Sequence, residues 1–510
     1  MSKTNSIVDT EPVNTKAILD EKSKNMNKLH EGTRLKRNFS LKYSEKFVQT
    51  IILLLTVYMV GVKFNTISTY NDIFTTVTKL FVFFFAQIFK NFSIEEGIDT
   101  LPPFEIIYSF YLPFMLSLLL DENLVYINTI LSFNVIENVN YVTRFLLQAL
   151  LILFLKSDPI ESIAAIFINM GFAWFLEKIG ELKSLDNIDC NLFSILLTNI
   201  LFLIGCPDSI PFQILKGTVI AFLITITINY WISFPLKKYV KNQHLKSMAL
   251  LSNFVITFPF LTDMIIILPN SAKEQPVKWL FNYIFESRCR QIILLTWLSF
   301  LLILIPNILM FHSNFSLNTS RKVWHFIILL LILKPFKIDQ QFIKIALSGT
   351  IPLFLSVEYL RYLKLEPIGK YLDSRLRSFS DFRDDKGPII ISYIYLIIGI
   401  SFPLLVANSP VGLISLGIGD SMASIIGGRY GKLKWKGTSK TVEGTIAFVL
   451  STSCVSAIAK YYMNYFEDLS WIGVFTLCLL SGLLEGNSIL NDNIMIPAFM
   501  LICEKLLITS

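Results

Sequence analysis

Apolar residues run along most of this chain in long blocks separated by short polar connectors. A helix needs about 20 apolar residues to cross a bilayer, and shorter blocks fit tilted or re-entrant segments. The pattern predicts an all-α polytopic membrane protein with about 12–16 transmembrane helices. Residues 124–136 are ambiguous. The blocks are 47–62, 73–89, 104–120, 141–155, 160–176, 191–205, 213–234, 248–268, 291–311, 323–335, 342–360, 388–407, 410–427, 444–462, 471–486 and 493–508.

The first 46 residues differ from the rest, with ten Lys/Arg against six Asp/Glu and no periodic apolar face. Such a composition cannot bury enough apolar surface to fold. We therefore expect residues 1–46 to form a disordered cytoplasmic tail. Residues 47–311 then form an N-terminal transmembrane region of unclear role, and residues 312–510 a C-terminal transmembrane domain with most of the suggestive polar motifs.

Basic connectors predict the orientation, because cytoplasmic loops of membrane proteins are rich in Lys and Arg. Residues 235–246 hold four lysines and no acid, and residues 428–441 hold five cations and no acid. Counting helices from the second connector places 321–325, 361–387 and 484–493 on the same, cytoplasmic side. Four polar clusters of the last 190 residues are thus expected on one face.

Composition supports the membrane assignment, since 53% of the residues are apolar and only 16% charged, against roughly 25% in soluble domains. The net charge of +7 fits basic loops that meet anionic lipid or phosphate, and we expect no nucleic-acid partner. Six cysteines without a CxxC pair are expected to be buried thiols. Four histidines without an HExxH motif argue against a zinc hydrolase.

The most informative charge is Asp420, in "GIGDSMASIIGG" (417–428). An ionised carboxylate in an apolar run costs several kcal/mol on insertion scales, roughly 2.5–3.5, so it must face a cavity, a cation or a partner. The glycines and serines around it also fit a small-residue surface for helix packing. Packing explains the glycines but leaves Asp420 unexplained.

The basic loop "RYGKLKWKGTSKTVEG" (429–444) follows directly. It resembles a phosphate-binding loop without matching GxxxxGK[ST], because Ser439 stands where the second glycine should be. Glycine turns can still expose main-chain N–H groups, and a lysine can neutralise phosphate oxygens. We expect Lys440, among hydroxyl residues, to contact phosphate. For Lys432, Lys434 and Lys436 an orientation signal with turn glycines is the favoured explanation.

Three other motifs add polar groups to this face. "LLEGNSILNDN" (483–493) offers oxygen ligands that suit a hard cation such as Mg²⁺, although Asp and Asn also cap helices. In "SRKVWH" (320–325), Arg321 and Lys322 fit orientation markers. Glu358 and Arg361 are spaced to pair on a helix face. These clusters together indicate phosphoryl or nucleotidyl transfer to a lipid at the cytoplasmic surface.

The motifs resemble the CTP-dependent dolichol, polyprenol and phytol kinase family. "GDSMASIIGGRYGKLKWKGTSKTVEGTIA" is similar to its nucleotide-binding segment and "LLEGNSILNDNIMIPAFM" to its later acidic motif. "RKVWH" resembles its basic motif, and "FRDDKGPIIISYIYLIIGISFPLLV" resembles the dolichol kinase branch. The likeness covers roughly residues 320–500. Lys436 and the pair Gly486–Asn487 depart from the usual pattern, which leaves the local backbone less defined.

The resemblance implies a kinase domain over 312–510 that transfers the γ-phosphoryl group of CTP to dolichol, with Mg²⁺ or Ca²⁺ as cofactor. The expected location is the endoplasmic reticulum membrane, multi-pass, with the site facing the cytoplasm. Dolichyl phosphate would then serve N-glycosylation, O-mannosylation and GPI-anchor synthesis. Expected catalytic residues are Asp420, Glu485 and Lys440; metal ligands, Asp420 and Asp492; nucleotide contacts, Gly428, Arg429, Gly431, Lys432, Gly437, Thr438, Ser439, Lys440, Thr441, Glu443 and Gly444; supporting residues, Arg321, His325, Glu358, Arg361, Asp384 and Asn493.

Two alternatives stay open. A CTP-dependent lipid cytidylyltransferase shares a nucleotide, a metal and membrane helices, but "GGRYGK" lacks the Asp-Arg expected after its glycine pair. A polytopic transporter could use Asp420 and Glu358 in a substrate pathway. Clustering of polar motifs at one face argues against it, since transporters concentrate such residues near the midplane. The choice between Asp420 and Glu485 as base, the prenyl length and the oligomeric state also stay open.

Overall fold

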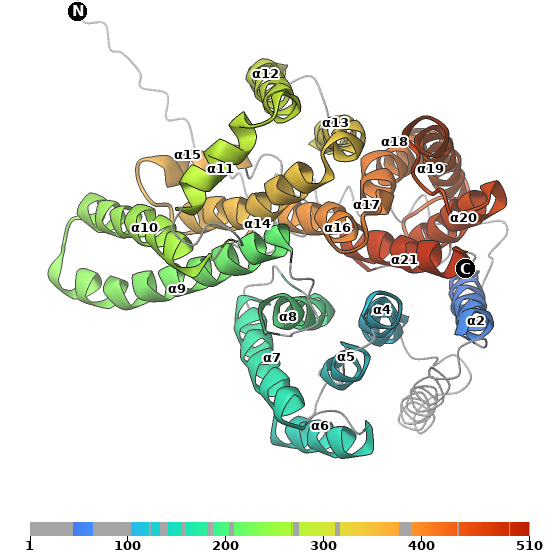
Figure 1. The fold of residues 1–510 in the computed structure, drawn as a ribbon, viewed down its shortest axis with the longest axis horizontal. Helices are drawn as coiled ribbons and strands as arrows, with labels where there is room; N and C mark the ends of the chain where they lie inside the picture. Colours follow the sequence, from blue (N-terminus) through green and yellow to red (C-terminus); the bar gives the residue numbers. More distant parts are fainter. Residues whose placement is uncertain are drawn as a thin grey trace, which may run out of the picture. The chain divides into compact units, whose positions relative to one another are not determined.

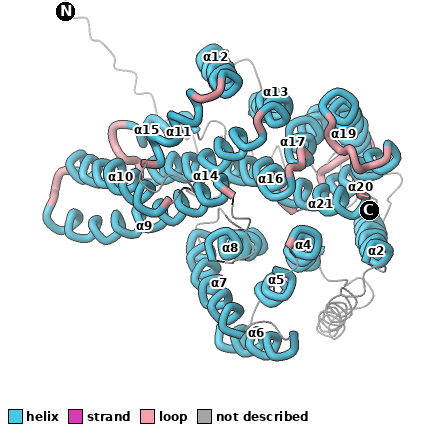
Figure 2. The backbone as a smooth tube through the Cα atoms, viewed as in Figure 1, coloured by secondary structure: helices cyan, strands magenta, loops and turns pink. Residues whose placement is uncertain are grey.

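The fold is built from α-helices joined by short loops. A computed structural model describes residues 44–64, 104–121, 124–132, 141–155, 159–180, 185, 187–202, 209–266, 268, 275–311, 317–376, 389–435, 438–488 and 490–508. Contacts divide the chain into two units, Met1–Ser44 and Glu45–Ser510, and the second is the one described here. Within these residues every regular element is helical (Figure 2). The all-α prediction is confirmed.

The helices follow the predicted apolar blocks. Those before residue 312 are α2 (Ser44–Phe64), α4 (Phe104–Leu120), α5 (Leu124–Ser132), α6 (Tyr141–Leu155), α7 (Pro159–Gly180), α8 (Asn187–Phe202), α9 (Ile210–Tyr239), α10 (Gln243–Ile265), α11 (Pro276–Phe285) and α12 (Arg288–Phe311). Those after it are α13 (Leu317–Ile338), α14 (Gln340–Tyr362), α15 (Ile368–Leu376), α16 (Ser392–Ala407), α17 (Val411–Ile414), the π-helical turn η5 (Ser415–Gly419), α18 (Asp420–Tyr430), α19 (Val442–Met463), α20 (Trp471–Asn487) and α21 (Asp492–Leu507).

Some elements add to the predicted blocks. The ambiguous segment forms helix α5, and two short helices, α11 and α15, lie in connectors that no apolar block covers. The block 410–427 is divided by the turn η5. The block 73–89 lies outside the described residues, as does the tail before Ser44.

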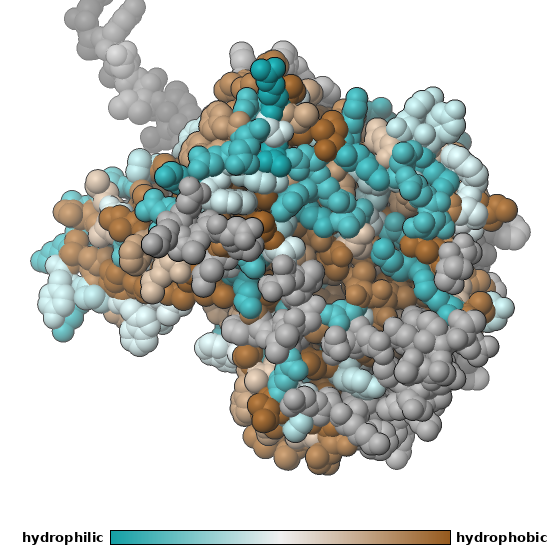
Figure 3. Space-filling view, in the orientation of Figure 1, coloured by the Kyte–Doolittle hydropathy of each residue, from teal (hydrophilic) through white to brown (hydrophobic). Residues whose placement is uncertain are grey.

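The apolar helices make this a membrane protein. Among the residues that the structure describes, six helices are long and apolar enough to cross a bilayer by length and composition, and six shorter apolar helices accompany them. Many large apolar side chains point outward, including Trp231 on α9 and Ile256 on α10, at 67% and 69% exposure. In Figure 3 hydrophobic residues cover much of the part that Figure 1 labels α9 and α10, and hydrophilic residues gather near α13, α18 and α19. An apolar exterior of this kind suits lipid as solvent.

Helix α21 lies at the centre of the C-terminal region. Its residues Met495–Cys503 are buried on all sides, as expected for a helix that is apolar all round. It packs against α16 and α20 of its own half and against α4 of the N-terminal half. Helix α8 also reaches the C-terminal half, because the Tyr395 hydroxyl on α16 donates to buried Asp189, 2.8 Å away. The two halves therefore share one core.

Contacts between distant connectors agree with the predicted sidedness. His244 contacts Glu366, which joins two segments that are both expected on the cytoplasmic side. The same helix count puts residues 336–341 and the end of block 444–462 on the opposite, lumenal side, and there the Lys337 ammonium donates to the carbonyl of Asn464, 2.6 Å away. The connector that holds His244 is placed by its lysines, and the other three segments are placed by the helix count.

Candidate active site

Asp420 is positioned by the π-helical turn that precedes it. Its main-chain N–H bonds to the carbonyl of Ser415, five residues back, and such turns inside α-helices are frequent at functional sites. The glycines of the turn serve packing. A Cβ at Gly417 would lie 2.8 Å from the Leu329 side chain, and one at Gly419 would lie 2.7 Å from Phe448. Close approach of α13 and α19 thus explains these glycines, while Asp420 begins a new helix.

Two basic residues of α13 contact the Asp420 carboxylate. The Lys322 ammonium donates to its Oδ2, and His325 Nδ1 lies 3.6 Å from the same oxygen. His325 Nδ1 also lies 3.2 Å from the carbonyl oxygen of Leu416 in the π turn. Both neighbours are acceptors, so we assign the ring proton to Nδ1. Lys322, interpreted above as an orientation marker, is therefore part of the site. The side chain of Arg321 lies outside the described residues.

The basic loop folds back on itself between α18 and α19. Val442 N donates to the Leu433 carbonyl at 2.8 Å, and Trp435 N donates to the Lys440 carbonyl at 3.0 Å. The Glu443 carboxylate accepts the main-chain N–H groups of Lys432 and Leu433, at 2.9 and 3.1 Å. Glu443 thus shapes the loop.

Thr441 caps helix α19 and organises two of the predicted glycines. Its hydroxyl oxygen accepts the N–H of Gly444 at 3.1 Å. A Cβ at Gly431 would lie 2.7 Å from the same oxygen, and one at Gly444 would lie 3.1 Å from it, whereas one at Gly428 would meet nothing within 4 Å. Gly431 and Gly444 therefore have a packing role. Gly437 lies outside the described residues, and Arg429 and Ser439 are exposed.

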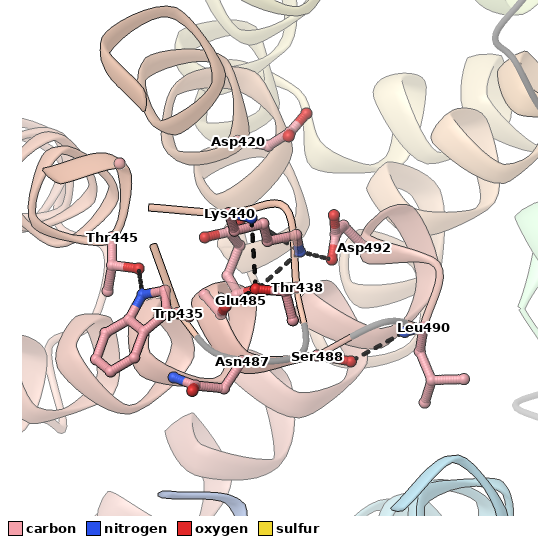
Figure 4. Close-up of polar contacts among 12 residues, drawn as sticks. Asp420, Trp435, Thr438, Lys440, Thr445, Glu485, Asn487, Ser488, Leu490 and Asp492 are labelled. Atoms are coloured by element: carbon pink, nitrogen blue, oxygen red, sulfur yellow. Dashed lines mark hydrogen bonds and ion pairs between the residues drawn. The ribbon is translucent and has the colours of Figure 1, made fainter. Parts of the chain in front are cut away.

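Lys440 joins the basic loop to the acidic motif (Figure 4). Its ammonium donates to the Glu485 carbonyl and to Asp492 Oδ1, each at 2.7 Å, and lies 3.3 Å from Glu485 Oε1. Burial opposes the charge on Lys440, but Asp492 and Glu485 outweigh burial, so the pKa of the ammonium lies well above its usual range. A lysine has three donors, and three acceptors of the protein surround this one. Lys440 is thus a clamp between the two motifs.

Further contacts fix the loop against the end of α20. The Thr438 hydroxyl donates to the Gly486 carbonyl at 3.2 Å, and the Trp435 indole N–H donates to the Thr445 hydroxyl at 2.9 Å. A Cβ at Gly486 would lie 2.6 Å from Trp435 Nε1 and 2.2 Å from Thr445 Oγ1. Gly486, one of the departures from the family pattern, is therefore the residue that lets Trp435 pack here.

The acidic motif also begins helix α21. The Asn491 side chain accepts the N–H of Asn493 at 3.1 Å. Asn491 is therefore a helix cap, which is the alternative role that the sequence offered for residues of this motif. Asp492 is the first helical residue and points to Lys440 (Figure 4). Asn493 contributes packing through its main chain, since a Cβ at Gly399 of α16 would meet its carbonyl oxygen at 1.9 Å.

A second buried network surrounds Glu358 and Arg361. The predicted pair is bidentate, with Arg361 nitrogens 2.8 and 2.6 Å from the two carboxylate oxygens. Arg361 also donates to Asp373 at 2.5 Å, and Glu358 accepts the Ile390 N–H at 2.9 Å and the Tyr393 hydroxyl. This network braces α14, α15 and the start of α16 at one point. Asp384 lies outside the described residues.

The donor chemistry of the site fits a hard cation. Asp420, Glu485 and Asp492 supply carboxylate oxygens, and Mg²⁺ commonly takes one or two carboxylates plus phosphate and water. Within the described part of the chain no group of three or more His, Cys, Asp or Glu is arranged to hold a metal alone. Three carboxylates face Lys322 and Lys440, which leaves a formal charge of −1 with His325 neutral. The contacts of Asp420 are with Lys322 and His325 of α13, whereas Glu485 and Asp492 contact Lys440.

Comparison with known proteins identifies the family of the whole chain. The dolichol kinase N-terminal domain model matches residues 7–205. Dolichol kinase of Saccharomyces cerevisiae is 48% identical over 484 residues, which is 92% of this chain and 91% of that protein. Dolichol kinase sec59 of Schizosaccharomyces pombe is 36% identical over 251 residues, 44% of this chain and 50% of that protein.

A more distant relative is a probable chloroplastic phytol kinase of rice, 25% identical over 211 residues, 37% of this chain and 64% of that protein. No solved structure gives a significant match. The yeast protein matches this chain through both halves, including the helices that precede the polar motifs. Identity of 48% across nine-tenths of both proteins shows that the chain belongs to the dolichol kinase family.

Proposed function

We propose that this protein transfers the γ-phosphoryl group of CTP to the hydroxyl of dolichol, giving dolichyl phosphate and CDP. Family membership supports the lipid substrate and the reaction class. The observation that carries the proposal is the contact of Lys440, from the basic loop, with Glu485 and Asp492 of the acidic motif. Two motifs 45 residues or more apart in the chain thereby form one site.

The triphosphate would be held by Lys440, Arg429 and the main chain around Gly437–Ser439. The three donors of Lys440 already have acceptors within the protein, so phosphate oxygens would replace at least one of them. Arg429 is exposed beside the loop. Phosphoryl transfer needs positioning and charge neutralisation more than covalent help, which is what these cations offer.

Asp420 and Asp492 would hold Mg²⁺ or Ca²⁺, whose positive charge would offset the triphosphate. Either Glu485 or Asp420 would accept the proton of the dolichol hydroxyl as its oxygen bonds to the γ-phosphorus and the bond to the CDP oxygen breaks. The Lys322 ammonium donates to the Asp420 carboxylate and would fix it in place. His325 supports the same carboxylate from the neighbouring turn.

The cellular setting follows from the proposed product. The prenyl chain would lie among apolar helices, with its hydroxyl at the polar face that bears the loop. We place the enzyme in the endoplasmic reticulum membrane with this face toward the cytoplasm. Dolichyl phosphate made there would supply N-glycosylation, O-mannosylation and GPI-anchor synthesis.

The test is lipid phosphorylation in washed membranes with CTP labelled at the γ or the α position, and with labelled ATP. We expect γ-label from CTP in dolichyl phosphate, and much less label from ATP. Asp420→Asn should lower this rate at least about 100-fold, as loss of a general base or an essential charge does. The matched control is Asp468→Asn, an exposed acid in the α19–α20 connector.

Three results would count against the proposal. Label from the α position in the lipid would indicate a cytidylyltransferase. Equal use of ATP would remove CTP as the donor. Equal rates for Asp420→Asn and Asp468→Asn would exclude Asp420 from the site.

A further inference from the structure

Helix α20 ends at the candidate site, and its last carbonyls are satisfied by side chains from elsewhere. The last four carbonyls of an α-helix have no partner within the helix. Here Lys440 donates to the carbonyl of Glu485 at 2.7 Å, and Thr438 donates to that of Gly486 at 3.2 Å. The carbonyl of Asn487 accepts the side-chain amide of Gln49 at 2.5 Å. Two of these donors come from the basic loop and the third comes from α2.

We propose that Gln49 is a positioning residue of the active site, so that helix α2 of the N-terminal region is a working part of the phosphotransfer centre. This inference rests on the proposed function for its kinetic consequence. Nothing in the local sequence around Gln49 suggests such a role, because its partner is 438 residues away. The N-terminal region thereby gains a defined contribution to the chemistry.

The contact is buried and specific. Gln49 is 2% exposed and Asn487 is fully buried, so water cannot replace the donor. A buried carbonyl without a donor is costly, and the last helical turn would rearrange to find one. Glu485 lies two residues before Asn487 and holds Lys440 through both its carbonyl and its carboxylate. Movement of this turn therefore moves the clamp.

Helix α2 has other attachments, which makes a clean substitution possible. Near its far end the Lys63 ammonium donates to the carbonyl of Lys505 in α21. Ile52 and Val60 are buried in the main hydrophobic core. From Gln49 to Lys63 is roughly 21 Å along the helix axis. Loss of the amide at Gln49 should therefore leave α2 docked and affect only the end of α20.

The experiment compares Gln49→Met with Gln148→Met in the full chain. Methionine keeps the length and apolar stem of glutamine and removes the amide donor. Gln148 is a matched control because it is equally buried and its side-chain amide donates to a carbonyl, that of Ile130, at 3.3 Å in the α5–α6 region. Each variant is measured per amount of folded enzyme, with thermal melting as the check on folding.

We expect Gln49→Met to lower kcat/KM for CTP about tenfold, which corresponds to about 1.4 kcal/mol. The KM for dolichol should stay within about twofold, and Gln148→Met should change neither constant beyond that range. Gln49→Asn, which is one methylene shorter but keeps the amide, should recover part of the loss. A purely structural role would instead lower the melting temperature of both variants without this kinetic split.

Hydrogen exchange gives an arm that needs no substrate. Amides of 483–488 should exchange faster in Gln49→Met than in the parent or in Gln148→Met. If exchange there is unchanged and kcat/KM for CTP equals that of Gln148→Met, the positioning role is overturned. If the parent enzyme fails to phosphorylate dolichol, the proposed function fails, while faster exchange in Gln49→Met would still support the contact as the organiser of this turn.

Discussion

Replacing Lys440 with methionine tests the clamp between the two motifs most directly. The substitution keeps the apolar stem and removes the ammonium, which has contacts of 2.7, 2.7 and 3.3 Å with Glu485 and Asp492. Hydrogen bonds to charged groups contribute about 1.5–3 kcal/mol each. The Lys440 side chain is 23% exposed, so solvent screening favours the low end of this range. Because contacts to one ammonium are not additive, we take about 3 kcal/mol for the set.

That energy predicts a loss of about 100-fold in kcat/KM for CTP, since each 1.36 kcal/mol is a factor of ten in rate. Initial rates of dolichol phosphorylation in reconstituted vesicles, per amount of folded enzyme, measure this loss. The matched control is Lys434→Met, which removes the same charge from an exposed position of the same loop and should stay within about twofold. A Lys440→Met enzyme as active as Lys434→Met would refute the clamp.

Two further predictions follow from the same loop. Gly486→Ala would place a Cβ 2.2 Å from Thr445 Oγ1 and 2.6 Å from Trp435 Nε1. We expect a loss of about 1–3 kcal/mol of stability, seen as a lower melting temperature. The control Gly349→Ala, whose Cβ would meet nothing within 4 Å, should melt at the temperature of the parent. The raised pKa of Lys440 means that its contribution is complete below the unfolded value of about 10.4 and is lost only as pH rises through the higher folded value. The pH dependence of the phosphorylation rate between pH 7 and 10 should therefore be the same in the parent enzyme and in Lys440→Arg. A pKa in that range that shifts in Lys440→Arg would contradict the raised pKa of Lys440.

The charges of the site could be found from the sequence because they are costly where they stand. Asp420 and Glu485 interrupt apolar runs, and Lys440 and Asp492 lie in the short connectors beside them. Such charges need a cavity, a cation or another partner, so the sequence predicts that the polar clusters share one face, whereas the pairing of Lys440 with Glu485 and Asp492 is a finding of the structure. The helix count placed the connectors together, and the contacts of Lys440 join two of them.

Other parts of the site had weaker signals or none. Lys322 and His325 are three residues apart and therefore lie on one helix face, from which both can contact one acid. From the sequence, Lys322 is interpreted as an orientation marker instead, because a positive charge at a membrane entrance is expected from orientation alone. No sequence motif points to Trp435, and its fit depends on the missing side chain of Gly486. Gln49 had no local signal, since tertiary contact alone defines its partner.

The π-helical turn at Ser415–Gly419 divides one apolar run into a part that packs in the core and a part that begins with Asp420. Each residue of a helix turns the following ones by about 100°, so the extra residue in this turn resets the register of everything from Asp420 onward. Residues 411–414 can then be selected for fit to the hydrophobic core, while the direction of the Asp420 side chain is set separately. Deleting one residue of the turn would leave composition and hydropathy almost unchanged yet swing Asp420 away from α13. Substitutions in residues 411–414 can thus repack the core during evolution without changing the direction of the Asp420 side chain.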